Sequence, residues 1–129
     1  MVCCCAEDKG IYRPPVVRGG TLAVFVKNDV VDDLRSVPGI GDISGRRLAG
    51  AGILTTYQLI GKFLMGKSLG LSQQDHCNAF YRFLLSVGFF PIYASRVVQA
   101  IGMKADSIFP GVYDEDVLTA PSGGCPAPC

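Results

Sequence analysis

The feature that most constrains this chain is residues 37–52, VPGIGDISGRRLAGAG, where Gly-Ile-Gly directly precedes a helix-forming segment. Gly39 and Gly41 permit a tight turn, and Gly45 offers a small residue where two helices are expected to cross closely. The apolar residues expected to pack the two helices together are Leu34, Val37, Ile40 and Leu48. The spacing predicts a helix-hairpin-helix whose second helix covers about 42–51.

Helical spacing of apolar residues continues on both sides of this stretch. The other predicted helices cover residues 30–36, 57–65, 72–87 and 91–101. Thr55 or Thr56 and Ser72 are suited to cap helix starts, because their hydroxyls accept hydrogen bonds from free backbone N–H groups. Pro91 suits a first helical turn, and Gly102 is expected to end the last helix. The predicted fold class is therefore all-α, a compact five-helix bundle built around the helix-hairpin-helix.

The two ends of the chain differ from its body in composition. Residues 1–27 are rich in cysteine and proline and are expected to form an extended arm. Within this arm, TLAVFVK (21–27) is interpreted as a short strand or as apolar packing. Residues 28–109 form the predicted helical domain, and residues 110–129 form a tail that is acidic and then rich in proline, glycine and cysteine.

Charge and hydropathy exclude several classes of protein. The formal net charge is only +1, so nucleic-acid binding must depend on a local patch rather than on bulk attraction. No apolar run approaches the roughly 18 residues that a membrane span needs, and no signal peptide is visible. We therefore predict no membrane span and no secretion by a signal peptide.

Five of the six cysteines lie near the chain ends, and only Cys77 falls within a predicted helix. The terminal cysteines are Cys3, Cys4, Cys5, Cys125 and Cys129. A disulfide framework normally spreads through the fold of a small secreted domain, so this pattern favours reduced thiols or tethers between tails. A thiolate metal site and S-acylation remain open alternatives, but no metal and no cofactor is predicted.

The chain lacks the residue sets of an enzyme. Its single histidine, His76, falls beside the apolar face of a predicted helix, where a structural or exposed position is expected. No Ser/His/Asp set, phosphate-binding loop, HExxH or CxxC motif is present. The acidic run 114–116 lies in the tail and is expected to be solvated. We therefore predict that the protein is not an enzyme.

The Gly-Ile-Gly turn carries the functional prediction. Such a turn leaves backbone N–H groups unpaired at a helix start, where they attract anions. Arg46 or Arg47, one turn later, can reach the same phosphate or its neighbour. Contacts of this kind read no bases, so binding is expected to be sequence-independent and salt-sensitive. Asp42 argues against the prediction, because its carboxylate lies where a phosphate would approach.

Residues 37–64 resemble the central stretch of the barrier-to-autointegration factor family, small chromatin proteins of animals. The shared residues are Gly39, Ile40, Gly41, Gly45, Arg46, Arg47, Leu48, Gly52, Tyr57, Gly61, Phe63 and Leu64. The rest of 28–109 fits the family in the position and length of its helices. The resemblance implies a helical homodimer that binds the backbone of double-stranded DNA, one hairpin per subunit, and so bridges or compacts duplexes.

The resemblance also implies site residues and a dimer face. The predicted DNA-binding residues are Gly39, Ile40, Gly41, Ile43, Arg46 and Arg47. Gly39, Gly41 and Ile43 would present backbone amides, and Arg47 would supply the cation. The dimer face would include Tyr57, Phe63, Phe83, Phe89 and Phe90.

The chain departs from the family at its ends. A Cys-rich arm replaces the family's first short helix, the chain has no tryptophan, and the acidic tail has no counterpart. We interpret it as a divergent relative, viral or protist, acting in the nucleus or in a viral particle. The alternative is a structural or assembly protein, such as a minor virion component, that reuses the fold and tethers neighbours with its arms. Near-neutral charge and terminal cysteines favour this alternative.

Overall fold

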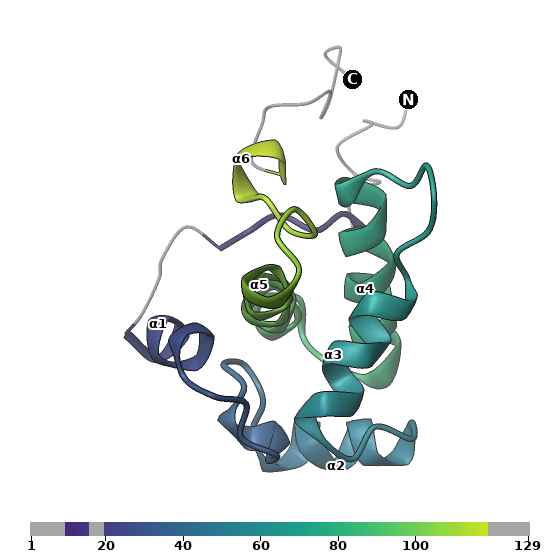
Figure 1. Ribbon diagram of the computed structural model, residues 1–129. Coiled ribbons are helices and arrows are strands. Elements are labelled where there is room, and N and C mark those ends of the chain that lie inside the picture. Colours follow the sequence, from purple (N-terminus) through teal and green to yellow (C-terminus); the bar gives the residue numbers. More distant parts are fainter. Residues whose placement is uncertain (1–9, 16–19, 119–129) are drawn as a thin grey trace, which may run out of the picture.

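The computed structural model describes residues 10–15 and 20–118 (Figure 1). Over these residues the chain is all-helical and contains no strand, which confirms the predicted fold class. The helices are α1 (Gly20–Lys27), the 3-10 turn η2 (Leu34–Ser36), α2 (Asp42–Gly50), α3 (Thr56–Met65), α4 (Gln73–Val87), α5 (Pro91–Ile108) and α6 (Glu115–Leu118). The described part thus holds six α-helices rather than the five expected.

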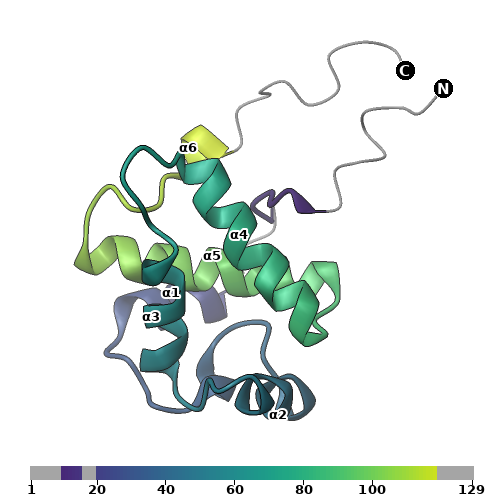
Figure 2. The ribbon, with the colours of Figure 1, turned by 90° about the vertical axis from the view of Figure 1, so that its right-hand side faces the viewer.

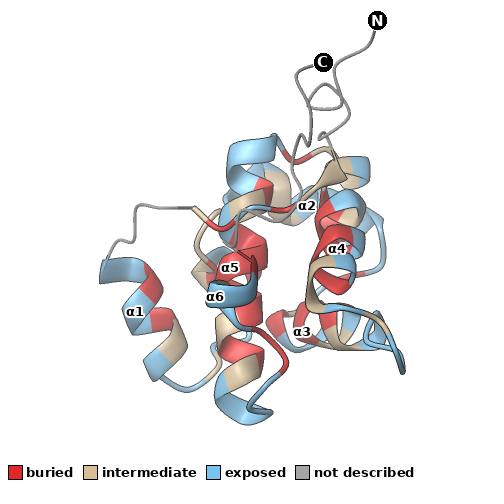
Figure 3. Cartoon of the chain, turned by 90° about the horizontal axis from the view of Figure 1, so that it is seen from above, coloured by how far each residue is buried: buried red, intermediate tan, exposed pale blue. Residues whose placement is uncertain are grey.

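Helix α5 forms the centre of the bundle. Helices α1, α3 and α4 all pack against it, and Figure 1 looks almost along its axis, with α1 and α4 on opposite sides. Its inward residues, such as Val97, Val98 and Ile101, are completely buried (Figure 3). Helix α2 lies at one end of the molecule, below α5 in Figure 2. This placement leaves much of α2 open to solvent.

The starts of three helices agree with the sequence prediction. The Thr55 hydroxyl accepts a hydrogen bond from the Gln58 amide at 3.1 Å, and the Ser72 hydroxyl accepts one from the Asp75 amide at 3.1 Å. Each bond satisfies an N–H group that the helix itself cannot pair. Pro91 occupies the first turn of α5, as expected.

Two segments before the hairpin differ from expectation. Residues 21–27 lie in helix α1 rather than in a strand, because Leu22 and Phe25, three residues apart, bury the same helix face. The helix predicted over 30–36 is reduced to η2. There the Asp33 side chain accepts a hydrogen bond from the Arg35 amide and holds a single turn.

Gly102 does not end α5, which continues to Ile108. A methyl group at Gly102 would lie only 2.4 Å from the Tyr113 ring, so the glycine serves close packing rather than helix termination. The ring belongs to the segment after α5, which turns back over the helix. The prediction failed because the partner that requires glycine here comes from outside the helix.

Both segments expected to be arms contribute side chains to the core. Tyr12 is completely buried, and its amide donates to Oδ1 of Asn78 in α4 at 2.8 Å. The hydroxyls of Tyr12 and Tyr113 share a hydrogen bond of 2.7 Å. Val112, Tyr113 and Leu118 are buried in the same core. The terminal cysteines named above lie outside the described residues.

His76 is a buried structural residue of α4. Its Nε2 lies 2.6 Å from the Phe63 carbonyl oxygen, and its ring stacks on the Phe63 ring with 4.3 Å between centres. Among the described residues its Nδ1 has no hydrogen-bond partner. Burial lowers the pKa of His76, a shift that the Phe63 carbonyl opposes and the charge of Lys67 reinforces. The neutral ring with hydrogen on Nε2 therefore fits this site.

We expect His76 to make the fold acid-sensitive. Because its folded-state pKa lies below the ordinary value of 6.5, the unfolded chain binds a proton more readily. The contribution of neutral His76 is complete above pH 6.5. It is lost as the pH falls toward the lowered pKa, by up to about 1.4 kcal/mol per pH unit. Urea unfolding between pH 7.5 and 5 measures this slope. A His76→Gln variant, which keeps a donor for Phe63, should lose that part of the slope; an unchanged slope would contradict the assignment.

Candidate nucleic-acid interface

Residues 34–50, called the hairpin from here on, join η2 to α2 through a tight turn. The Val37 amide donates to the Leu34 carbonyl at 3.0 Å, and the Ile40 amide donates to the Val37 carbonyl at 3.1 Å. The apolar residues expected to join the two halves are all buried: Leu34, Val37, Ile40 and Leu48. The hairpin is thus folded onto the core, with its turn at the start of α2.

The two glycines of the turn have different roles. Gly39 has a φ of +99°, which only glycine adopts readily, and a methyl group there would lie 2.9 Å from the Tyr93 carbonyl oxygen. Gly41 has an extended backbone, and a methyl group there would meet nothing within 4 Å. The fold therefore requires glycine at 39 but not at 41.

The absent side chain at Gly41 leaves the start of α2 uncapped. The first amide to pair within the helix is that of Gly45, which donates to the Gly41 carbonyl at 2.9 Å. Gly41 has no side chain that could accept from the amides that follow it, those of Asp42, Ile43 and Ser44. Free amides together with the positive end of the helix dipole make this position attractive to an anion.

A hollow of about 600 Å³ lies over this helix start, lined by residues 39–44 and by Tyr93 and Arg96 of α5. The Arg96 guanidinium lies 5.9 Å from the centre of the Tyr93 ring. Arg96 is exposed, and within the described residues it has no hydrogen-bond or ion-pair partner. The site therefore includes a cation that sequence analysis missed. In the sequence, the only indication that Arg96 belongs to the site is that it follows Tyr93 by three residues, on the outward face of α5.

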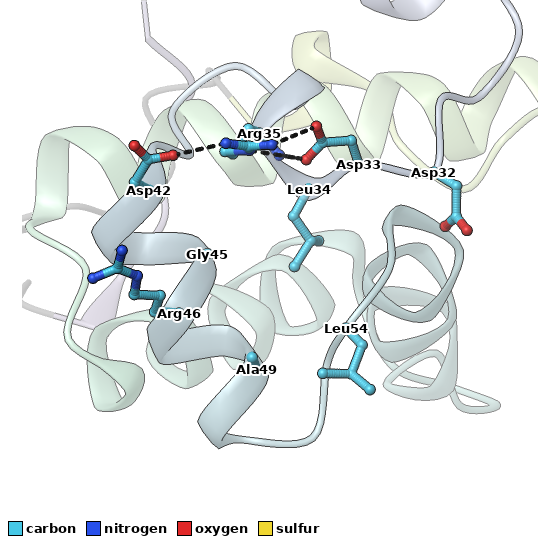
Figure 4. A pocket seen from close by; sticks show the side chains of 9 residues that line it. All are labelled: Asp32, Asp33, Leu34, Arg35, Asp42, Gly45, Arg46, Ala49 and Leu54. Atoms are coloured by element: carbon cyan, nitrogen blue, oxygen red, sulfur yellow. Dashed lines mark hydrogen bonds and ion pairs between the residues drawn. The ribbon is translucent and has the colours of Figure 1, made fainter.

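The paired arginines of α2 are placed differently from each other. Nη1 of Arg47 donates to the Gly88 carbonyl at 2.6 Å, so this side chain is engaged with the turn between α4 and α5. Arg46 is exposed and, in the part of the chain that the structure describes, has no hydrogen-bond or ion-pair partner. Among the residues drawn in Figure 4, dashed lines join Arg35 to Asp33 and Asp42, and none reaches Arg46. Arg46 is thus the freer of the two cations expected from the sequence.

Asp42, which argued against an anion site, is paired. Nη1 of Arg35 lies 3.1 Å from Oδ1 of Asp42, and the same guanidinium donates to both carboxylate oxygens of Asp33 at 3.2 Å (Figure 4). The hydrogen bond from the Arg35 side chain is the main cause that lowers the pKa of Asp33. Arg35 therefore offsets part of the negative charge beside the helix start.

A second hollow lies on another side of α2 and is shown in Figure 4. It is lined by Asp32, Asp33, Leu34, Arg35, Asp42, Gly45, Arg46, Ala49 and Leu54. This hollow does not attract an anion, because its lining holds three carboxylates and only two guanidinium groups. The expected close crossing at Gly45 is wrong, because a methyl group there would meet nothing within 4 Å.

The residues expected at a dimer face are divided between core and surface. Phe63 and Phe89 are buried and Phe83 is partly buried, whereas Tyr57 and Phe90 are exposed. Phe63 and Phe89 serve the core of a single subunit. Any contact with a second subunit in this region would depend on the two exposed rings.

Nucleophilic and metal-binding groups are sparse in the described residues. Cys77 is a free, buried thiol, and burial raises its pKa to about 12, so it is protonated at neutral pH. Over residues 10–15 and 20–118, no three His, Cys, Asp or Glu side chains gather as a metal site. None of the described helices is both long and apolar enough to span a bilayer.

No protein-family model matches this chain. The same is true of the curated proteins and of the solved structures, none of which matches it.

Proposed function

We propose that this protein binds the backbone of double-stranded DNA, independently of sequence, at the start of α2. The observation that carries the proposal is the open access to the uncapped amides after Gly41, where the fold does not require glycine. A serine or aspartate would be the ordinary residue at such a position. Glycine leaves the amides available, because position 41 has no side chain that could cover them.

The distribution of charge supports the same proposal. Arg96 of α5 lines the hollow at the helix start, and Arg46 of α2 is an exposed cation one turn later that lines the second hollow. Arg35 is occupied by Asp33 and Asp42. With a net charge of only +1, this local arrangement must supply most of the attraction. Phosphate contacts of this kind carry affinity without reading bases.

The proposal extends to a homodimer that bridges or compacts DNA, acting in the nucleus or in a viral particle without catalysis. The resemblance of 37–64 to the barrier-to-autointegration factor family supports it, as does the exposure of Tyr57. Two subunits would offer two backbone sites and so connect two duplexes. Light scattering measures the mass of the free protein, and a monomer would contradict the bridging part of the proposal.

The test is a salt series with a labelled duplex of random sequence. We expect Arg46→Ala/Arg96→Ala to weaken binding at low salt at least about tenfold, and to reduce the slope of log K against log[salt] by about 2, because two phosphate contacts are lost. The matched control is Lys27→Ala/Lys67→Ala, which removes two exposed cations elsewhere and should change neither quantity by as much. Equal losses in the two variants, or no binding by the wild type, would contradict the proposal.

The second candidate is a structural or assembly protein, and the core contacts of both end segments favour it. Tyr12 and Tyr113 hold residues near the two ends against the bundle, so that a force on either tail would reach the core directly. A wild-type protein that binds no duplex at low salt, yet sediments as a large assembly, would favour this function instead.

A further inference from the structure

Four large apolar side chains are exposed at the starts of α2 and α5, the two helices that line the candidate interface. They are Ile43 (66% exposed), Phe90 (69%), Ile92 (59%) and Tyr93 (44%). We call these four residues the apolar rim. A soluble surface rarely gathers side chains of this size beside a charged site without a use for them. The backbone contacts of the proposed function do not use them.

The apolar rim is held in place by two structural elements. Ile43 in the first turn of α2 and Tyr93 in the first turn of α5 line the same hollow. The Tyr93 amide donates to the Phe90 carbonyl at 3.0 Å, and residues three apart at a helix start lie on neighbouring positions of one side. The bond from Arg47 to the Gly88 carbonyl fixes the turn before α5 to α2.

The surrounding charges argue against a second copy of the chain as the occupant. A symmetric contact through the rim would bring Arg46, Arg96 and the positive end of α2 close to their own copies. A blunt duplex fits only in part, because it presents phosphates and sugars while its bases are stacked inside. DNA with unpaired bases fits both the apolar rim and the cations, since its bases stack on aromatic rings while its phosphates meet the cations.

We propose that this site prefers DNA that carries unpaired bases, with the phosphates at the start of α2 and the bases stacked on Phe90 and Tyr93. The contact between the phosphates and the start of α2 rests on the proposed function. The stacking of bases is argued from the two exposed rings, Tyr93 in the lining of the hollow and Phe90 three residues before it. Ile43 and Ile92 would then shield the stacked bases from water.

Three labelled DNAs test the proposal: a blunt duplex, the same duplex with a short single-stranded tail, and the tail sequence alone. We expect the wild type to bind the tailed duplex about tenfold more tightly than the blunt one, as stacking of one or two bases predicts. Phe90→Ala/Tyr93→Ala should remove this advantage, lowering the affinity for the tailed duplex more than the affinity for the blunt one. The matched control is Tyr57→Ala/Met65→Ala, which removes two exposed apolar side chains of α3 and should keep the advantage. Thermal unfolding confirms that each variant is folded.

The outcomes separate this inference from the proposed function. Equal binding of blunt and tailed duplex by the wild type, or a tail advantage that survives in Phe90→Ala/Tyr93→Ala, would overturn the inference and leave duplex binding standing. Binding of tailed and single-stranded DNA without the blunt duplex would support the inference and overturn the duplex proposal. Absence of binding to all three overturns both. A dimer that Phe90→Ala/Tyr93→Ala converts to a monomer would show that a second copy covers the rim, and would also overturn the inference.

Discussion

Replacing Tyr12 with alanine is expected to lower the free energy of unfolding by about 4 kcal/mol, the usual cost of removing a large buried aromatic side chain. Tyr12 is completely buried, and its ring packs near those of Tyr81 and Tyr113. Its hydroxyl also shares a hydrogen bond with the Tyr113 hydroxyl. Alanine would leave a cavity between the N-terminal segment, α4 and the segment after α5. Urea unfolding followed by circular dichroism measures the loss.

Two further variants separate the ring of Tyr12 from its hydroxyl. Tyr12→Phe should cost only about 1 kcal/mol, because it removes one hydrogen bond while Tyr113 still donates to Glu115 at 2.9 Å. Tyr57→Ala, at an exposed position, should stay within about 0.5 kcal/mol of the wild type. Unfolding of Tyr12→Ala at the wild-type urea concentration would show that residues 10–15 do not belong to the core.

The parts of the fold that could be predicted from the sequence are those decided by near neighbours. Helices α3 and α4 begin at Thr56 and Gln73, as their capping residues indicate, because a cap acts on an amide three residues away. The apolar residues of the hairpin are buried as their spacing predicts. Capping and helical periodicity are both local, so the sequence contains all the information that they need.

Two of the failed predictions concern contacts between distant residues. In the sequence Gly102 resembles a helix stop, but in the structure it makes room for the Tyr113 ring. Tyr12 resembles part of an extended arm, but its hydroxyl shares a hydrogen bond with that of Tyr113, 101 residues away. The candidate site likewise combines features decided by neighbouring residues with features decided by distant ones. The open amides after Gly41 follow from adjacent residues, whereas Arg96 reaches the site only because α5 packs against the turn.

Gly39→Ala is expected to lower the free energy of unfolding by about 3 kcal/mol, combining a disfavoured backbone conformation with a steric clash. The added methyl group would lie 2.9 Å from the Tyr93 carbonyl oxygen and 3.0 Å from Cγ2 of Val97. The first is a backbone atom of the central helix and cannot rotate away. The turn must therefore move from α5, which also separates the α2 amides from Arg96. Both unfolding by urea and affinity for duplex DNA measure the effect.

Gly41→Asp is the matching change two residues later, and it should affect binding without affecting the fold. The backbone at Gly41 is extended and its surroundings are open, so aspartate fits there and caps α2, changing stability by only a few tenths of a kcal/mol. Its carboxylate would occupy the amides offered to a phosphate and repel the ligand, so we expect at least about tenfold weaker duplex binding. Wild-type affinity in Gly41→Asp would place the DNA elsewhere on the molecule. Loss of binding in this stable variant, beside loss of both stability and binding in Gly39→Ala, would separate the glycine that shapes the turn from the glycine that opens it to a phosphate.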